Sequence, residues 1–254
     1  SFKKKFNELC GFTETEVYEV IQKINAECGF SFDTVEQAMM MIKTYYNGYR
    51  FFRKHVQDIY NPTLCIYFFK IYQEECEFPS QMLDQNLAMD DSKLEFTASL
   101  PQGRDMVLEL SQKGSELVVP EISQGFGLRE ILRTESKDRT FLASFLYFFG
   151  VLTLVRENLE GKLVLKVPNL VMQKLYVEQV QLMLLPEPKI RDEGLQLAEL
   201  VTVKGDIGPL CGFVQDKLLQ IFKNRDYRWA NELTLKTAFM TLLYDDILYL
   251  MDSE

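Results

Sequence analysis

The chain has almost no histidine and lacks the common glycine motifs that bind nucleotides. Its 254 residues include one histidine, His55, so a zinc site or a catalytic triad built on histidine would have to use this residue. We interpret His55, in the stretch FFRKHVQD, as a solvated loop residue. None of the 13 glycines lies in a GxxxxGK[ST] pattern. A standard P-loop ATPase therefore cannot operate from this chain alone.

Long apolar runs and an excess of positive charge are also missing. The longest apolar stretch, FLASFLYFFGVLTLV at 141–155, is shorter than the roughly 18 residues of a membrane span and is interrupted by Gly150. The first residues, SFKKKFNELCGF, have no apolar core of a signal peptide. A net charge of −9 opposes broad binding to nucleic acid phosphates. We expect an intracellular protein, cytoplasmic or nuclear, with no membrane partner and with nucleic acid unlikely as a partner of this chain alone.

The cysteines form no CxxC pair. They are odd in number and widely spaced, at Cys10, Cys28, Cys65, Cys76 and Cys211. This distribution is typical of buried thiols in a reducing compartment. We therefore predict structural thiols and no disulfide framework.

Two ExK triplets superficially match the metal-binding half of a nuclease site. They are Glu160-Gly-Lys162, in a predicted hairpin turn, and Glu187-Pro-Lys189, which contains a proline. A Mg²⁺ site needs convergent carboxylates rather than one isolated pair of residues. We interpret both triplets as solvated charges and predict no metal site in this chain.

Local signals predict three helices in the first part of the chain. Thr13 and Glu16 form a capping box at the start of the first helix, and Gly29 ends it. Asp33 is the expected N-cap of a second helix, which ends at Asn47-Gly48. Asn61 and Pro62 are the expected N-cap and first residue of a third helix.

Strand signals are concentrated near the middle of the chain. A short β-like run at 115–123 is stopped by Pro120, and two β-rich runs between Val151 and Val167 are joined by a turn at Gly161. The segment KDRTFLASFLYFFG before them reads as a buried helix, and helical periodicity returns after Pro168. We predict a mainly α fold: a multi-helical lid region, a helix plus β-hairpin (winged-helix-like) unit, and a C-terminal helical segment.

Five segments occur in an order that resembles a known family. They are CGFTETEV (10–17), YYNGYRF (45–51), IYNPTLCIYFF (59–69), SFLYFFGVLTL (144–154) and LKVPNLVMQ (165–173). Together they resemble AAA-ATPase-like proteins that carry a C-terminal PD-(D/E)XK nuclease domain. The segment WANELTLKTAFMTLL at 229–243 resembles the opening helix of that nuclease domain.

The resemblance implies a domain plan and partners. Residues 1–134 would be the helical lid-like region of the ATPase-like domain, 135–184 a helix, β-hairpin and helix unit, and 185–254 a helical linker leading into a truncated nuclease-like domain. The P-loop core would precede this chain and the nuclease strands would follow it, so both would be partners. The parent would bind ATP and Mg²⁺, whereas no cofactor is expected in this chain. Glu232 matches a nuclease-domain glutamate but is an orphan without the other catalytic residues.

The aromatic and basic stretch at 45–62 is the candidate site. In the related ATPases the segment after the core packs over the nucleotide, which would make Tyr49, Arg50, Asn61 and Pro62 nucleotide-facing. Arg50 could direct charge at phosphate, Tyr49 could stack, and the helix start at Asn61-Pro62 could offer free N–H groups. In the alternative interpretation, Asn47-Gly48 is a helix stop and the tyrosines belong to the core.

Two hypotheses for function follow. In the first, the chain is a non-catalytic lid and linker module of an AAA-ATPase-like, nuclease-associated protein. In the second, it is a free-standing helical interaction domain that binds another protein or, less expectedly, nucleic acid. No catalytic residue is assigned within the chain under either hypothesis.

Overall fold

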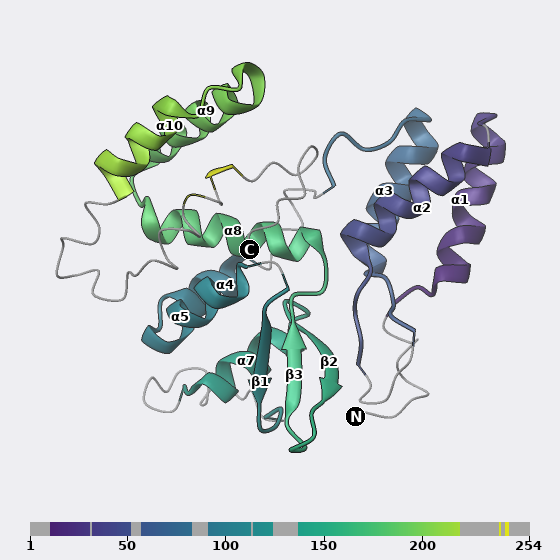
Figure 1. Cartoon of the computed structure of the whole chain (residues 1–254). Helices are drawn as coiled ribbons and strands as arrows, with labels where there is room; N and C mark the ends of the chain where they lie inside the picture. The colour runs from purple at the N-terminus through teal and green to yellow at the C-terminus, as the bar shows by residue number, and fades with distance from the viewer. Residues whose placement is uncertain are drawn as a thin grey trace. The chain divides into compact units, whose positions relative to one another are not determined.

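The computed structural model describes residues 11–30, 32–51, 57–82, 91–112, 114–123 and 137–218, with positions 239, 242 and 243. His55 and Glu232 lie outside the described residues. As predicted, the fold is mainly α, with one small antiparallel sheet (Figure 1). The helices are α1 (Glu14–Cys28), α2 (Phe32–Tyr46), α3 (Pro62–Glu75), α4 (Asp91–Ala98), α5 (Pro101–Leu110), α7 (Arg139–Phe148), α8 (Leu170–Leu184), α9 (Pro188–Lys204) and α10 (Gly208–Phe213).

The chain divides into two compact units, and each unit combines two separate stretches of sequence. The first comprises residues 1–93 and 116–173, and the second comprises residues 94–115 and 174–254. The domain limits proposed from the sequence, at 134 and 184, describe family segments rather than compact units. They stay a prediction.

Helices α1, α2 and α3 begin and end close to where their capping residues predict. Thr13 accepts a hydrogen bond from the Glu16 N–H while Glu16 accepts one from the Thr13 N–H, which completes the capping box of α1. Gly29 ends α1 in the left-handed conformation at φ 71°. The prediction for Asp33 is wrong by a small margin, because α2 already includes Phe32 and Asp33 lies within its first turn.

The core of the three helices consists of apolar side chains at helical spacing. Figure 1 shows the three helices grouped together, and contacts connect every pair of them. The buried side chains come from one face of each helix: Val17, Ile21 and Ile24 of α1, Val35, Ala38 and Ile42 of α2, and Leu64, Phe68 and Tyr72 of α3. These i, i+3 and i+4 spacings identify the buried face from sequence alone.

The sheet has three antiparallel strands in the order β1-β3-β2. Strands β2 (Thr153–Glu157) and β3 (Leu163–Lys166) form the predicted hairpin, with a bulge between Leu154 and Arg156. Strand β1 (Glu116–Val119) falls in the predicted β-like run and pairs with β3, Glu116 opposite Lys166. The sequence did not predict this pairing. It makes β3 the central strand and means that segment 135–184 does not contain the whole sheet.

The second unit contains α5, α9, α10 and most of α8. Helix α9 has Pro188 at its start and ends at Gly205 in the left-handed conformation. Gly194 of α9 lies close to the side chains of Phe213 and Leu242, where an added Cβ would be 3.0 Å from both. Helix α10 continues into a π-helical turn, Val214–Leu218. No described helix in either unit is both long and apolar enough to cross a membrane.

The prediction of buried thiols is wrong for Cys28 and Cys76, which form a disulfide, and for Cys211, which is exposed. Cys28 and Cys76 form a disulfide that joins positions 48 residues apart. Cys65 is a fully buried thiol, as predicted, and burial raises its pKa to about 12. Cys211 is free but exposed, and Cys10 lies outside the described residues. The pairing depends on the ends of α1 and α3 meeting, so spacing along the chain could not reveal it. The inference of a reducing compartment, which was based on unpaired thiols, therefore loses that support.

Candidate functional site

All five segments that carry the family resemblance meet in one place in the first compact unit. We call this place the motif joint and define it by Phe12 and the ranges 46–51, 58–61, 153–155 and 168–169. Direct hydrogen bonds connect each of these ranges to at least one other. The following contacts establish its geometry.

Backbone bridges connect the first three segments. Phe12 and Tyr60 exchange two hydrogen bonds, N to O, of 3.1 and 2.9 Å. Tyr49 and Ile59 do the same at 3.2 and 2.9 Å. The Asn61 N–H also donates to the Tyr46 carbonyl at 2.9 Å. The starts of α1 and α3 and the end of α2 are thus fixed to one another through main-chain atoms.

Gly48 brings the fifth segment against the second. Its backbone has φ +99°, and a Cβ at this position would lie 2.1 Å from the Pro168 carbonyl oxygen. Asn169 donates from its side-chain amide to the Asn47 carbonyl at 2.9 Å. Only glycine satisfies both the left-handed backbone and the close approach of Pro168. The Asn47-Gly48 pair is therefore a helix stop, as predicted, and also a contact point.

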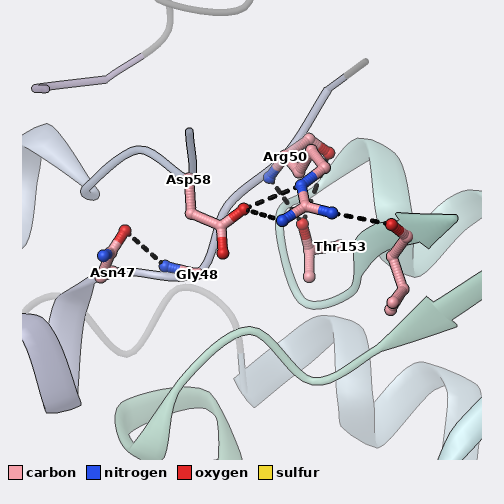
Figure 2. Close-up of polar contacts among 6 residues, drawn as sticks. Asn47, Gly48, Arg50, Asp58 and Thr153 are labelled. Carbon is pink, nitrogen blue, oxygen red and sulfur yellow. Dashed lines mark hydrogen bonds and ion pairs between the residues drawn. The ribbon is translucent and has the colours of Figure 1, made fainter. Parts of the chain in front are cut away.

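Arg50 connects the loop to the sheet. Its Nε donates to Asp58 Oδ1 at 2.8 Å, and its guanidinium also donates to the Val155 carbonyl at 2.8 Å (Figure 2). The Arg50 N–H donates to the Thr153 hydroxyl at 2.7 Å. Arg50 and Asp58 side chains are 18% and 30% exposed. The Arg50 guanidinium therefore makes its hydrogen bonds to residues of the motif joint.

The tyrosines of the joint are core residues. Tyr46 and Tyr60 are fully buried and Tyr49 is 5% exposed. Burial raises the pKa of Tyr46 and Tyr60 well above the usual range, and for Tyr60 the Glu14 carboxylate adds to the effect. The interpretation of these tyrosines as core is confirmed. In this arrangement the Tyr49 ring has no exposed face of the size that base stacking requires.

Asn61 and Pro62 begin α3 as predicted, but the expected free N–H groups are taken. The Asn61 side-chain oxygen accepts hydrogen bonds from the N–H groups of Thr63 and Leu64, at 3.0 and 3.2 Å. Pro62 has no N–H to offer. The start of α3 is therefore already capped, and an anion would have to displace Asn61 to bind there.

The structure brings the predicted residues Tyr49, Arg50 and Asn61 together within the joint, and Pro62 follows Asn61 directly as the first residue of α3. Sequence reasoning missed their partners Asp58 and Thr153. Asp58 follows the aromatic and basic stretch directly, and Thr153 is the one hydroxyl residue in the apolar run VLTLV. Both signals were visible, but nothing local indicated that Arg50 would reach residues more than 100 positions away.

The ExK triplets are solvated, as predicted. Glu160 and Lys162 form an ion pair of 2.7 Å with both side chains about half exposed or more, at 69% and 47%. The hydrogen bond from Lys162, and then its charge, lower the pKa of Glu160. Glu187 is the residue before α9 and is exposed. Within the described ranges, no three His, Cys, Asp or Glu side chains are placed to hold a metal ion.

The chain was compared with protein-family models, with curated proteins and with solved structures. None of the three comparisons finds a match. The family resemblance therefore rests on the five sequence segments alone.

Proposed function

We propose that the chain is the non-catalytic lid and linker module of an AAA-ATPase-like, nuclease-associated protein. The observation that supports this proposal is the motif joint, in which each of the five resembling segments is hydrogen-bonded to at least one of the others. A set of short motifs spread over more than 150 residues is otherwise hard to explain, because segments that only filled separate helices would not need to meet. We infer that the five motifs together form one structural feature, the motif joint.

The contacts of the motif joint suit a part of the protein that moves as a rigid body. Backbone bridges fix the starts of α1 and α3 to the Tyr49–Arg50 segment, and Arg50 connects that segment to strand β2 through Thr153 and Val155. In a nucleotide-driven protein, a lid must carry a change at the nucleotide to a neighbouring domain without deforming internally. The joint supplies that stiffness within the first compact unit. The chemistry would belong to the core and nuclease domains of the parent, which would also hold ATP and Mg²⁺.

The hydrogen bonds that Arg50 already makes narrow the hypothesis that it contacts a nucleotide. To meet a phosphate, Arg50 would have to release Asp58 or the Val155 carbonyl, and Asp58 would then be left without its guanidinium partner. An exchange of that kind costs more than the use of a free surface cation. We therefore assign Arg50, Asn61 and Tyr49 first to the stiffness of the joint, and contact with nucleotide only to a rearranged parent complex.

Two measurements test the proposal. Sequencing of the full-length transcript should reveal a reading frame that continues upstream through a GKT or GKS segment and downstream through GRxD and ExK strands. The purified chain, given ATP or plasmid DNA with Mg²⁺, should show no turnover above a buffer control. A reading frame confined to these residues, or a metal-dependent activity abolished by a point substitution in the chain, would refute the module.

One observation favours the alternative, a free-standing domain that binds another protein. Phe148 and Phe149, at the end of α7, are 52% and 43% exposed, although they follow a run of buried residues. Exposed adjacent aromatics are common in protein interfaces. The transcript decides between the two hypotheses, because a short complete reading frame would support the interaction domain.

A further inference from the structure

Helices α1 and α3 are connected at both ends by different chemistry. At their starts, Phe12 and Tyr60 form the reciprocal backbone bridge, and at their ends Cys28 and Cys76 form the disulfide. The same number of residues separates Phe12 from Cys28 as separates Tyr60 from Cys76. The two helices therefore run side by side in matching register between a main-chain connection and a covalent one.

Several non-covalent contacts lie beside the disulfide. Tyr72 donates from its hydroxyl to the Asn25 side-chain oxygen at 3.3 Å, and the Asn25 amide donates to the Phe30 carbonyl at 3.2 Å. The rings of Phe30 and Tyr72 stack with centroids 5.7 Å apart. These contacts hold the two helix ends near each other independently of the sulfur–sulfur bond. If that bond is reduced, the thiols remain close enough to pair again.

The two cysteines of the bond are at the protein surface in part, whereas the third cysteine of these helices is buried and unreactive. Cys28 and Cys76 are partly exposed. Cys65 is fully buried, and burial raises its pKa to about 12, so it carries almost no thiolate at neutral pH. Since exchange proceeds through a thiolate, Cys65 does not compete for the pair. This arrangement favours reduction and re-oxidation of the Cys28–Cys76 bond without exchange with Cys65.

We propose that Cys28–Cys76 is a reversible redox latch on the three-helix part, opened by a dithiol reductant. We use the name latch for Cys28, Cys76 and the contacts of Asn25, Phe30 and Tyr72. A thiolate of the dithiol attacks one sulfur, forms a mixed disulfide and releases the other cysteine, which takes up a proton. The second thiol of the dithiol loses its proton and attacks the dithiol's own sulfur in the mixed disulfide. The dithiol leaves as its disulfide, and the second cysteine is released as a thiolate that takes up a proton. The latch gains two electrons and two protons, and the dithiol loses them.

The surroundings select among reductants. Four exposed glutamates adjoin the two cysteines in the chain: Glu27, Glu74, Glu75 and Glu77. Their negative charge disfavours the approach of the glutathione thiolate, with its additional carboxylates, more than the approach of a singly charged thiolate such as that of 2-mercaptoethanol. At low ionic strength, the triple variant Glu74→Gln/Glu75→Gln/Glu77→Gln should raise the rate of reduction by glutathione about threefold, with a smaller rise for 2-mercaptoethanol. Equal rises for both thiols would contradict the electrostatic selection.

Hydrogen exchange of the whole chain tests the latch. Oxidised protein is compared with protein reduced by dithiothreitol, and we expect exchange in the last turns of α1 and α3 to rise about tenfold or more. Amides of the joint, at Phe12, Tyr49 and Tyr60, should keep their protection. Removal of the reductant with mild oxidant should restore the Cys28–Cys76 pair, as identified by peptide mass spectrometry.

Matched variants complete the test. The exposed Cys211→Ser variant should respond to reductant as the unmodified chain does, and Cys28→Ser/Cys76→Ser should reproduce the reduced pattern without reductant. The proposal is overturned if reduction raises exchange equally throughout the first unit, if it changes nothing at the helix ends, or if re-oxidation gives other pairs. A double variant that fails to fold, together with unfolding of the reduced unmodified chain, would make the disulfide an essential staple rather than a latch.

Discussion

The two ends of the α1 and α3 pair are held by opposite means. The motif joint uses backbone hydrogen bonds, a glycine pressed against a carbonyl and a partly buried ion pair. The latch uses one covalent bond and a few side-chain contacts. Main-chain connections cannot be released without unfolding the segments that make them, whereas a disulfide can be reduced in place. The comparison teaches that the joint sets the architecture and the latch adjusts its stiffness.

The largest loss of stability should come from a substitution in the motif joint. Gly48→Ala places a Cβ 2.1 Å from the Pro168 carbonyl oxygen at φ +99°, so we expect a loss of more than about 4 kcal/mol or failure to fold. The matched control is Gly29→Ala at the latch end, where φ is +71° but nothing lies within 4 Å of the added Cβ. Backbone strain alone should cost about 1–2 kcal/mol there. Urea unfolding measures both, and equal losses would contradict the close approach at Gly48.

The next largest effect should come from the latch. Its loop spans 48 residues, for which the loss of loop-closure entropy predicts a stabilisation of roughly 4 kcal/mol. Unfolding by urea with and without dithiothreitol measures this difference on the unmodified sequence. Cys211→Ser should leave it unchanged. A difference near zero would mean that the non-covalent contacts already hold the helix ends and that the disulfide adds nothing to stability.

A smaller loss of stability is expected at two arginine–carboxylate pairs, and its size should differ between them. Arg50→Ala removes hydrogen bonds to Asp58 and to the Val155 carbonyl in a partly buried setting, so we expect a loss of about 1–3 kcal/mol. Arg156 makes a comparable pair with Glu116, but there the two side chains are 55% and 36% exposed. Arg156→Ala should therefore cost about 0.5 kcal/mol or less.

A double-mutant cycle with Asp58→Ala would isolate the coupling between Arg50 and Asp58. Equal losses for Arg50→Ala and Arg156→Ala would show that Arg50 is not a structural connection. Its commitment to the joint would then be refuted, and its contact with nucleotide would become the better hypothesis.

The smallest effect should come from the cap of α3. Asn61→Ala removes the acceptor for the N–H groups of Thr63 and Leu64, and we expect a loss of about 1 kcal/mol. Thr13→Ala, at the cap of α1, is the matched control and should cost a similar amount. Asn61→Asp, which keeps the acceptor, should be nearly neutral. Thermal unfolding of the three variants is sufficient, and an unchanged midpoint for Asn61→Ala would show that the cap contributes no stability.

Much of the fold could be predicted because its signals are local. The capping box at Thr13, the stop at Gly29 and the Asn61-Pro62 start each involve residues within a few positions of one another. The β-hairpin at 153–166 was visible for the same reason. The candidate site could be predicted only as a list of residues, Tyr49, Arg50, Asn61 and Pro62, because their partners are distant in the chain. Glu232 lies outside the described residues, so its assignment stays a prediction.

The sequence by itself therefore determined the capped helices of the first unit, the hairpin and the solvated ExK triplets, whereas it assigned the same buried thiol to every cysteine and only Cys65 fits. The tertiary structure alone decided that Arg50 reaches Thr153 and Val155, that Asn169 reaches Asn47, that β1 pairs with β3, and that Cys28 pairs with Cys76. Capping, turn formation and helical periodicity act over a few residues, so the sequence displays them directly. Pairing over 48 to 122 residues depends on the path of all the intervening chain, and no short stretch of sequence records that path.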